Sequence, residues 1–330
     1  MKTHIIPVIF LVFCLSGCSL GAIVNAPADS YSQTAFPTSQ TEQSSATAPA
    51  APAEVSTAPP ETQPPATEPP QTETTPPQML VQPEPEDADF VKVKTYIPDI
   101  VVDLRYATQN NFTNQQIYQF SDVWLRYGTV KKLILVQEEI RQSGLYLKIW
   151  DGFRPPSAQF QLWDVCPNPT YVANPNNGFS SHSRGNTVDL TLVYADGTAV
   201  VMPTDFDDFS SLADRNYSDC STEAEENALL LEEVMIKYGF KPYSGEWWHF
   251  TDSQSYPVDK DFEPTEASLY YAHCSEYISL RAQPDTTSEV ITKILAGEQF
   301  RVVATHGDFA LVEYRHLSGY VLRSYIQPVK

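Results

Sequence analysis

The chain has 330 residues, with 21 Lys and Arg against 41 Asp and Glu, for a net charge of −20. The length predicts two domains at roughly 150 residues each, and the charge argues against a nucleic-acid partner, because phosphate binding needs clustered Lys and Arg. Fourteen of the 27 prolines lie between Pro27 and Pro85. Ten acidic residues and no Lys or Arg lie between Pro27 and Asp89, so half of the net charge belongs to one stretch.

The amino terminus has the pattern of an export signal. Lys2 precedes an apolar run of 11 residues, Ile5 to Leu15, which is too short to span a bilayer core of about 30 Å but fits a signal peptide. The run ends in Leu15-Ser16-Gly17-Cys18, which resembles the lipobox of bacterial lipoproteins. The resemblance implies a lipoprotein signal peptide at 1–17 and lipidation of Cys18. The alternative is an ordinary secretory signal with an incidental Cys.

A lipidated Cys18 would anchor the exported protein to the outer face of the bacterial cell membrane, in the cell envelope. Residues 18–88 are rich in Pro, Thr, Ala, Ser, Gln and Glu. Such a composition buries too little apolar surface to offset the entropy of the chain. We expect a disordered linker that holds the folded part away from the membrane.

Residues 89–265 form the first predicted folded domain. Alternating apolar residues predict strands, and helical spacing with Thr129 as N-cap and Gly144 as stop predicts a helix. The expected strands are Ile100–Ala107, Leu145–Trp150 and Thr187–Val193, and the expected helices are Val130–Gly144 and Thr222–Tyr238. Mixed elements with hairpin signals predict an α+β fold whose central antiparallel sheet is flanked by helices.

This domain contains only two of the six histidines, His182 and His249. His182 lies in SSHSRGNTVD, which ends at Asp189, and His249 lies in GEWWHF, three residues after Glu246. A catalytic zinc site takes three protein ligands and leaves one position for water. His182, Asp189 and His249 would supply that set.

Glu246 and His249 impose a structural condition. In an extended strand, side chains three residues apart point to opposite faces. Both can reach one site only if the chain turns or bulges between them, so the sequence predicts such an irregularity.

Four motifs together, SSHSRGNTVDLTL, EWWHF, DGFRP and DLRYATQNNFT, resemble the D-alanyl-D-alanine dipeptidase family of zinc peptidases, which includes the vancomycin-resistance dipeptidases. The resemblance covers most of residues 96 to 252. Thr187 departs from the wider pattern, which usually carries Ala there, and we expect a packing variation at this position.

The resemblance implies roles for particular residues. His182, Asp189 and His249 would bind one Zn²⁺ per chain, Glu246 would be the general base for a zinc-activated water, and Arg154 would stabilise the oxyanion. Ser180, Asp207 and Tyr106 would bind the dipeptide. The implied activity is that of a zinc metallopeptidase that hydrolyses D-Ala-D-Ala.

Residues 266–330 change to short β segments separated by Gly297, Gly307 and Gly319. They resemble a bacterial SH3-like domain, a small all-β barrel that commonly binds cell-wall peptide or glycan. The expected partners are therefore the dipeptide or a peptidoglycan stem peptide, the cell wall, and the membrane through the lipid anchor.

The resemblance leaves alternatives open. The enzyme could be a D,D-carboxypeptidase or endopeptidase that trims peptidoglycan stem peptides, or a catalytically silent wall-binding lipoprotein. The intact set of His182, Asp189, Glu246, His249 and Arg154 argues against the silent protein. Export also permits a Cys166–Cys220 disulfide.

Overall fold

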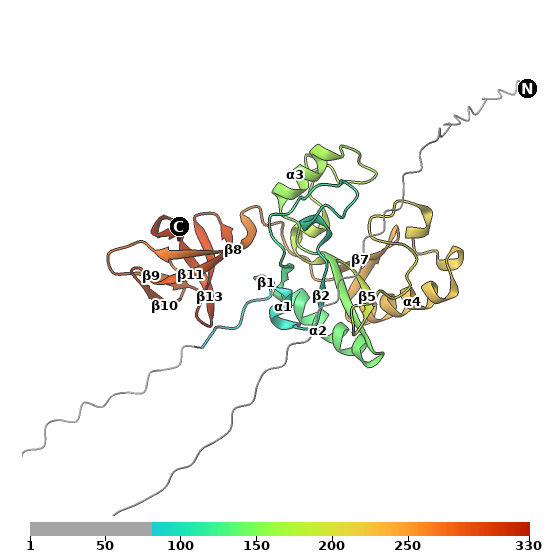
Figure 1. Ribbon diagram of the computed structural model, residues 1–330, viewed down its shortest axis with the longest axis horizontal. Coiled ribbons are helices and arrows are strands. Elements are labelled where there is room, and N and C mark those ends of the chain that lie inside the picture. Colours follow the sequence, from blue (N-terminus) through green and yellow to red (C-terminus); the bar gives the residue numbers. More distant parts are fainter. Residues whose placement is uncertain (1–80) are drawn as a thin grey trace, which may run out of the picture. The chain divides into compact units, whose positions relative to one another are not determined.

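The computed structural model describes residues 81–330 (Figure 1). The predicted signal peptide, Cys18 and most of the linker lie outside the described residues. Within residues 81–330, every helix is too short or too polar to cross a membrane.

A five-stranded sheet forms the centre of the first folded part, with the strand order β2-β4-β5-β7-β6. Neighbouring strands are antiparallel except at the edge, where β2 runs parallel to β4. The predicted antiparallel sheet is therefore confirmed, with one parallel edge strand. Its members are β2 (Val101–Val102), β4 (Leu145–Asp151), β5 (Thr187–Tyr194), β6 (Phe240–Tyr243) and β7 (Glu246–Asp252).

Helices cover this sheet. Helix α2 (Tyr127–Gln142) buries Val130, Leu133 and Ile140 along one face and packs on β4 and α4. Helix α4 (Thr222–Lys237) begins at Ser221, whose side chain accepts a hydrogen bond from the Ala224 N–H, as N-cap residues do. The other helices of this part are α1 (Val93–Tyr96) and α3 (Pro156–Val165).

The two long helices confirm the prediction to within a few residues. Gly144 follows α2 with φ +76°, the left-handed conformation that ends many helices. Thr129 is not the N-cap, because the helix begins at Tyr127; the Thr129 hydroxyl instead donates to buried Asp252. Helix α3, with Pro156 as its first residue, was not predicted.

The strand predicted at Ile100–Ala107 is largely wrong. Only Val101 and Val102 pair with β4, and residues Arg105–Ala107 form a 3₁₀ turn. This turn buries the ring of Tyr106 and brings it to the site described below. In this segment, tertiary packing therefore overrides the strand preference of the β-branched residues.

The remaining strands form two further sheets. A short sheet pairs β1 (Phe90–Lys92) with β3 (Trp124–Arg126). A seven-stranded antiparallel sheet in the order β10-β9-β13-β12-β11-β8-β14 forms the carboxy-terminal module, which confirms its all-β character. Its strands are β8 (Phe262–Ala272), β9 (Tyr277–Arg281), β10 (Val290–Leu295), β11 (Gln299–His306), β12 (Phe309–Tyr314), β13 (Leu317–Leu322) and β14 (Ile326–Pro328).

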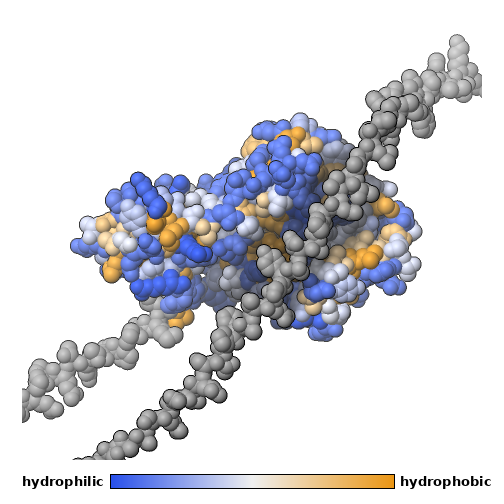
Figure 2. Space-filling view, viewed as in Figure 1, coloured by the Kyte–Doolittle hydropathy of each residue, from blue (hydrophilic) through white to orange (hydrophobic). Residues whose placement is uncertain are grey.

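The largest hydrophobic core includes Phe262 at the start of β8. The Phe262 ring stacks on Phe90 with centroids 4.3 Å apart and lies 5.6 Å from the ring of Phe153, which precedes Arg154. The face drawn in Figure 2 is largely hydrophilic, with hydrophobic residues in small separate areas. The cysteines among the described residues are free thiols, so the structure contains no Cys166–Cys220 disulfide.

Candidate active site

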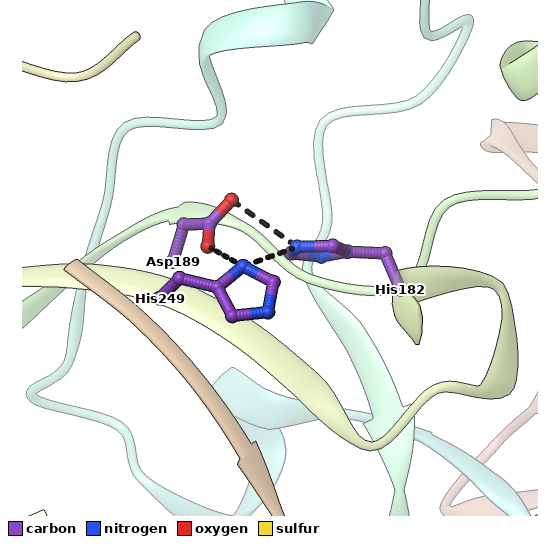
Figure 3. Close-up of side chains that lie close together, drawn as sticks. All are labelled: His182, Asp189 and His249. Carbon is purple, nitrogen blue, oxygen red and sulfur yellow. Dashed lines mark hydrogen bonds and ion pairs between the residues drawn. The ribbon is translucent and has the colours of Figure 1, made fainter. Parts of the chain in front are cut away.

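Three side chains converge where β5 and β7 lie side by side. Asp189 and His249 are directly opposite each other in the antiparallel ladder, which places their side chains together. His182 comes from a 3₁₀ turn at Ser181–Arg184 that precedes β5. Figure 3 shows the three side chains pointing toward one another.

The spacing of these atoms suits a metal ion. His182 Nε2 lies 3.3 Å from Asp189 Oδ2 and 3.4 Å from His249 Nδ1, and His249 Nδ1 lies 3.0 Å from Asp189 Oδ1. Two ligand atoms bound to a tetrahedral zinc at about 2.1 Å are about 3.4 Å apart. Among the described residues, this is the one cluster of His, Cys, Asp or Glu with such spacing. The ligand set predicted from the sequence therefore lies together.

The surroundings of the cluster also favour a cation. Asp189 Oδ1 is buried with His249 Nδ1 3.0 Å away, and a buried carboxylate is costly unless a cation or donor compensates it. Burial opposes the charge of Asp189, but the two histidines outweigh burial and lower the pKa of the carboxyl. His182 Nδ1 lies 2.8 Å from the Gly152 carbonyl. A hydrogen bond to that carbonyl leaves Nε2 free to bind metal.

The predicted irregularity between Glu246 and His249 is present. Strand β6 pairs regularly with β7 from Phe240↔Asp252 to Pro242↔Phe250, and then the register shifts so that Tyr243 pairs with Glu246. Three residues of β7, 247 to 249, thus have no partner in β6. This β-bulge brings Glu246 Oε2 to 3.4 Å from His249 Nδ1.

The carboxyl of Glu246 is perturbed by its surroundings. Burial and the neighbouring charge of Asp189 raise the pKa of its carboxyl above the ordinary value. A carboxylate with a raised pKa accepts a proton more readily near neutral pH. Its carboxylate lies beside the metal cluster.

Arg154 is held by a network that the sequence did not predict. Its Nη2 donates to Asp151 Oδ2 over 2.6 Å, Nε donates to the Tyr118 hydroxyl, and Nη1 donates to Gln159 Oε1. Burial opposes its charge, but Asp151, Tyr118 and Tyr106 together outweigh burial and raise the pKa of the guanidinium. Asp151 is fully buried and lies opposite Asp189 across β4 and β5. Arg154 therefore enters the site as a fixed positive charge.

Of these partners, only Asp151 had a signal in the sequence, as the acid of DGFRP. Tyr118 and Gln159 lie 36 and five residues from Arg154 in segments without a motif. The structure alone identifies them.

Asp207 and Tyr106 lie together beside the site. The Tyr106 hydroxyl donates to Asp207 Oδ2 over 2.9 Å, and the guanidinium of Arg154 lies over the Tyr106 ring at 5.1 Å. Burial is the main cause that raises the pKa of Asp207 to about 8, and Asp189 adds to it. A cation close to Asp207 would therefore stabilise the ionised form of this buried carboxyl.

Ser180 and Thr187 also lie close to the residues of the metal cluster. Ser180 is the N-cap of the turn that carries His182, and its side chain accepts from the His182 N–H. Thr187 is more than a packing variation: its hydroxyl lies 3.0 Å from that of Thr251, which is 3.5 Å from His249 Nε2.

The sequence was compared with known proteins. Residues 86–267 match the family model of the D-Ala-D-Ala dipeptidases, and residues 276–327 match a bacterial SH3 domain. The D-alanyl-D-alanine dipeptidase of Escherichia coli (strain K12) is 35% identical over 178 residues, which cover 53% of this chain and 92% of that protein. The dipeptidase of the same name from Enterococcus faecium is 31% identical over 180 residues, which cover 47% and 89%.

A solved structure of VanYB in complex with D-Alanine-D-Alanine has 21% sequence identity and a TM-score of 0.27, over 40% of this chain and 73% of that chain. That likeness is too low to carry an argument. The first family model matches more than half of the chain, and its relatives share the region that holds the metal cluster. The chain therefore belongs to the D-Ala-D-Ala dipeptidase family of zinc metallopeptidases and carries a bacterial SH3 domain after its peptidase domain.

Proposed function

We propose that this protein hydrolyses free D-Ala-D-Ala at the cell envelope, with zinc held by His182, Asp189 and His249. The relatives named above are dipeptidases, and the donor set and its spacing fit zinc. Zinc bound there would lower the pKa of a coordinated water from 15.7 to about 7 and would polarise the carbonyl of the scissile peptide bond. The remaining steps belong to side chains of this chain.

Two side chains act on the reacting atoms. Glu246 accepts a proton from the attacking water and passes it to the leaving amine. Arg154 places its positive charge where the tetrahedral oxyanion forms, and its three neighbours hold it there before the reaction begins. A preorganised charge of this kind is worth about 3 kcal/mol of transition-state stabilisation.

The observation that favours a free dipeptide is the carboxyl of Asp207. A free dipeptide carries an α-ammonium group, and a stem peptide has an amide in its place. The Asp207 carboxyl is bound by one hydroxyl and is close enough to the site to respond to the charges of Asp189, Arg154 and Glu246. An ammonium placed there offsets the cost of burying the carboxylate.

Aromatic rings surround this position. The ring of Phe206 lies 5.7 Å from Tyr106, Phe112 lies 5.3 Å from Phe209, and Tyr171 lies 4.3 Å from Phe209. Rings from three separate loops thus pack against one another beside the Asp207 segment. The SH3 domain instead favours the alternative, a D,D-carboxypeptidase or endopeptidase that acts on peptidoglycan stem peptides.

The Asp207→Asn variant tests the ammonium site. Asn tolerates the left-handed backbone of this residue, whose φ is +57°. At pH 8, where part of Asp207 is ionised, we expect KM for D-Ala-D-Ala to rise at least about 10-fold, as for loss of a charged hydrogen bond, and KM for the N-acetylated dipeptide to stay unchanged. An equal rise for both substrates would contradict the assignment.

The same carboxyl predicts a pH dependence. Because its pKa is raised to about 8, Asp207 is neutral below that pH and attracts the ammonium only after it loses its proton. KM of the wild-type enzyme should therefore fall as the pH rises from 6 toward 8, and Asp207→Asn should abolish this trend. Initial rates at a series of pH values measure both.

We also propose that the protein is exported and anchored through a lipid on Cys18, and that its SH3 domain holds it on the cell wall. The apolar run and lipobox pattern support the anchor, and the SH3 match supports wall binding. Mass spectrometry of the mature amino terminus tests the anchor. An unmodified Cys18, or cleavage at another position, would contradict it.

A further inference from the structure

The β-bulge that joins Glu246 to the metal cluster leaves a gap in the sheet. Continuing the regular register of β6 and β7 would place Tyr243 opposite His249. Tyr243 pairs with Glu246 instead. The backbone carbonyls of Tyr243 and His249 therefore do not take part in a regular ladder between β6 and β7. A strand carbonyl that loses its ladder partner must be satisfied by another donor, most of all at His249, which is only partly exposed.

Arg215 meets this need. Its Nε donates to the Tyr243 carbonyl over 2.8 Å, and its Nη2 donates to the His249 carbonyl over 3.0 Å. The backbone N–H of Arg215 also donates to the Ser244 carbonyl. One planar guanidinium thus bridges the two strands where their ladder is broken.

The guanidinium is itself held in place. Nη1 donates to Glu232 Oε2 on α4 over 2.7 Å and to the Tyr217 hydroxyl over 3.2 Å. The Tyr217 hydroxyl donates to the same carboxylate oxygen, and the guanidinium lies over the Phe250 ring at 4.5 Å. The Arg215 side chain is only 10% exposed, and the rigid fork of donors suits two fixed carbonyls.

We propose that Arg215 is a positioning residue for the hydrolytic reaction: it fixes the bulge that turns Glu246 toward the metal ligands. Its hydrogen bonds go to backbone carbonyls of the bulge and to Glu232 and Tyr217, so it acts through the position of Glu246. His249 is held separately by its pairing with Asp189. Loss of Arg215 should therefore displace the general base more than the metal. The proposal rests on the proposed role of Glu246 as base.

The test is the Arg215→Ala variant of the full chain, with Arg141→Ala as the matched control. Arg141 also forms an ion pair, with Asp99, but lies on the exposed side of α2. For Arg215→Ala we expect kcat to fall about 100-fold, the effect of a displacement of roughly 1 Å, with KM little changed and a full zinc complement. Arg141→Ala should match the wild type.

Two further measurements separate positioning from general loss of structure. Added guanidinium ion at millimolar concentration should restore part of the kcat of Arg215→Ala and have no effect on Arg141→Ala. Arg215→Lys, which keeps the charge but loses the fork, should have a kcat between those of Arg215→Ala and the wild type.

Amide hydrogen exchange provides a readout that does not need activity. In the zinc-free protein, Arg215→Ala should speed exchange at residues 244–249 and leave β5 unchanged. Unchanged exchange there, or a fall in kcat that only follows loss of zinc, would overturn the proposal. If the wild type fails to cleave the dipeptide, the proposed function fails, and exchange still decides whether Arg215 holds the bulge.

Discussion

Replacing Glu246 by alanine should lower kcat for D-Ala-D-Ala by about 1,000-fold, within the range that a general base contributes. Glu246 lies beside the three-residue ligand set but outside it, so the variant should keep its full zinc complement. Steady-state rates and metal analysis of the same sample measure both quantities.

The control for this variant is Glu233→Ala, which removes an exposed glutamate from α4 of the same domain and should leave the rate unchanged. Substantial activity in Glu246→Ala would remove Glu246 from the role of base. Loss of zinc together with activity would instead assign Glu246 to the metal ligands.

Replacing His182 by alanine should abolish both zinc binding and activity. The variant removes one of three ligands and leaves the buried carboxylate of Asp189 with His249 alone. Even residues that merely support a metal ligand cost about 10- to 100-fold in affinity when changed, so loss of a ligand should weaken zinc binding by more than about 100-fold. Isothermal titration of the zinc-free protein measures this loss.

His273→Ala is the matched control, because His273 is an exposed histidine in the carboxy-terminal module. It should bind zinc as the wild type does, and circular dichroism of both variants checks that they are folded. A full zinc complement in His182→Ala would contradict the ligand assignment.

The metal cluster could be predicted because its members lie in two short motifs. Asp189 and His249 become cross-strand neighbours once β5 and β7 pair, and the short turn before β5 leaves His182 close to Asp189. The predicted bulge followed from strand geometry alone. A turn or a bulge between them was needed for Glu246 and His249 to share a site.

Other parts of the site depend on contacts between distant segments of the chain. Arg215 lies 34 residues from His249, whose carbonyl it binds, and Tyr118 lies 36 residues from Arg154. No local pattern marks either Arg215 or Tyr118, because their roles arise only when the loops that carry them fold against the sheet. Such residues could be identified from the structure but not from the sequence.

The edge of the central sheet was also decided by packing. The segment Ile100–Ala107 was predicted as a strand from its β-branched residues, but burial of the Tyr106 ring required a turn there. Strand preference is weak and depends on context, so tertiary packing overrides it.

The most direct test of the proposed function compares two substrates of the purified protein, D-Ala-D-Ala and a pentapeptide stem that ends in D-Ala-D-Ala. We predict rapid release of D-Ala from the dipeptide, loss of this activity with a chelator, its return with added zinc, and little release from the stem. Release of D-Ala from the stem alone, or cleavage of the dipeptide that survives complete removal of zinc, would contradict the account.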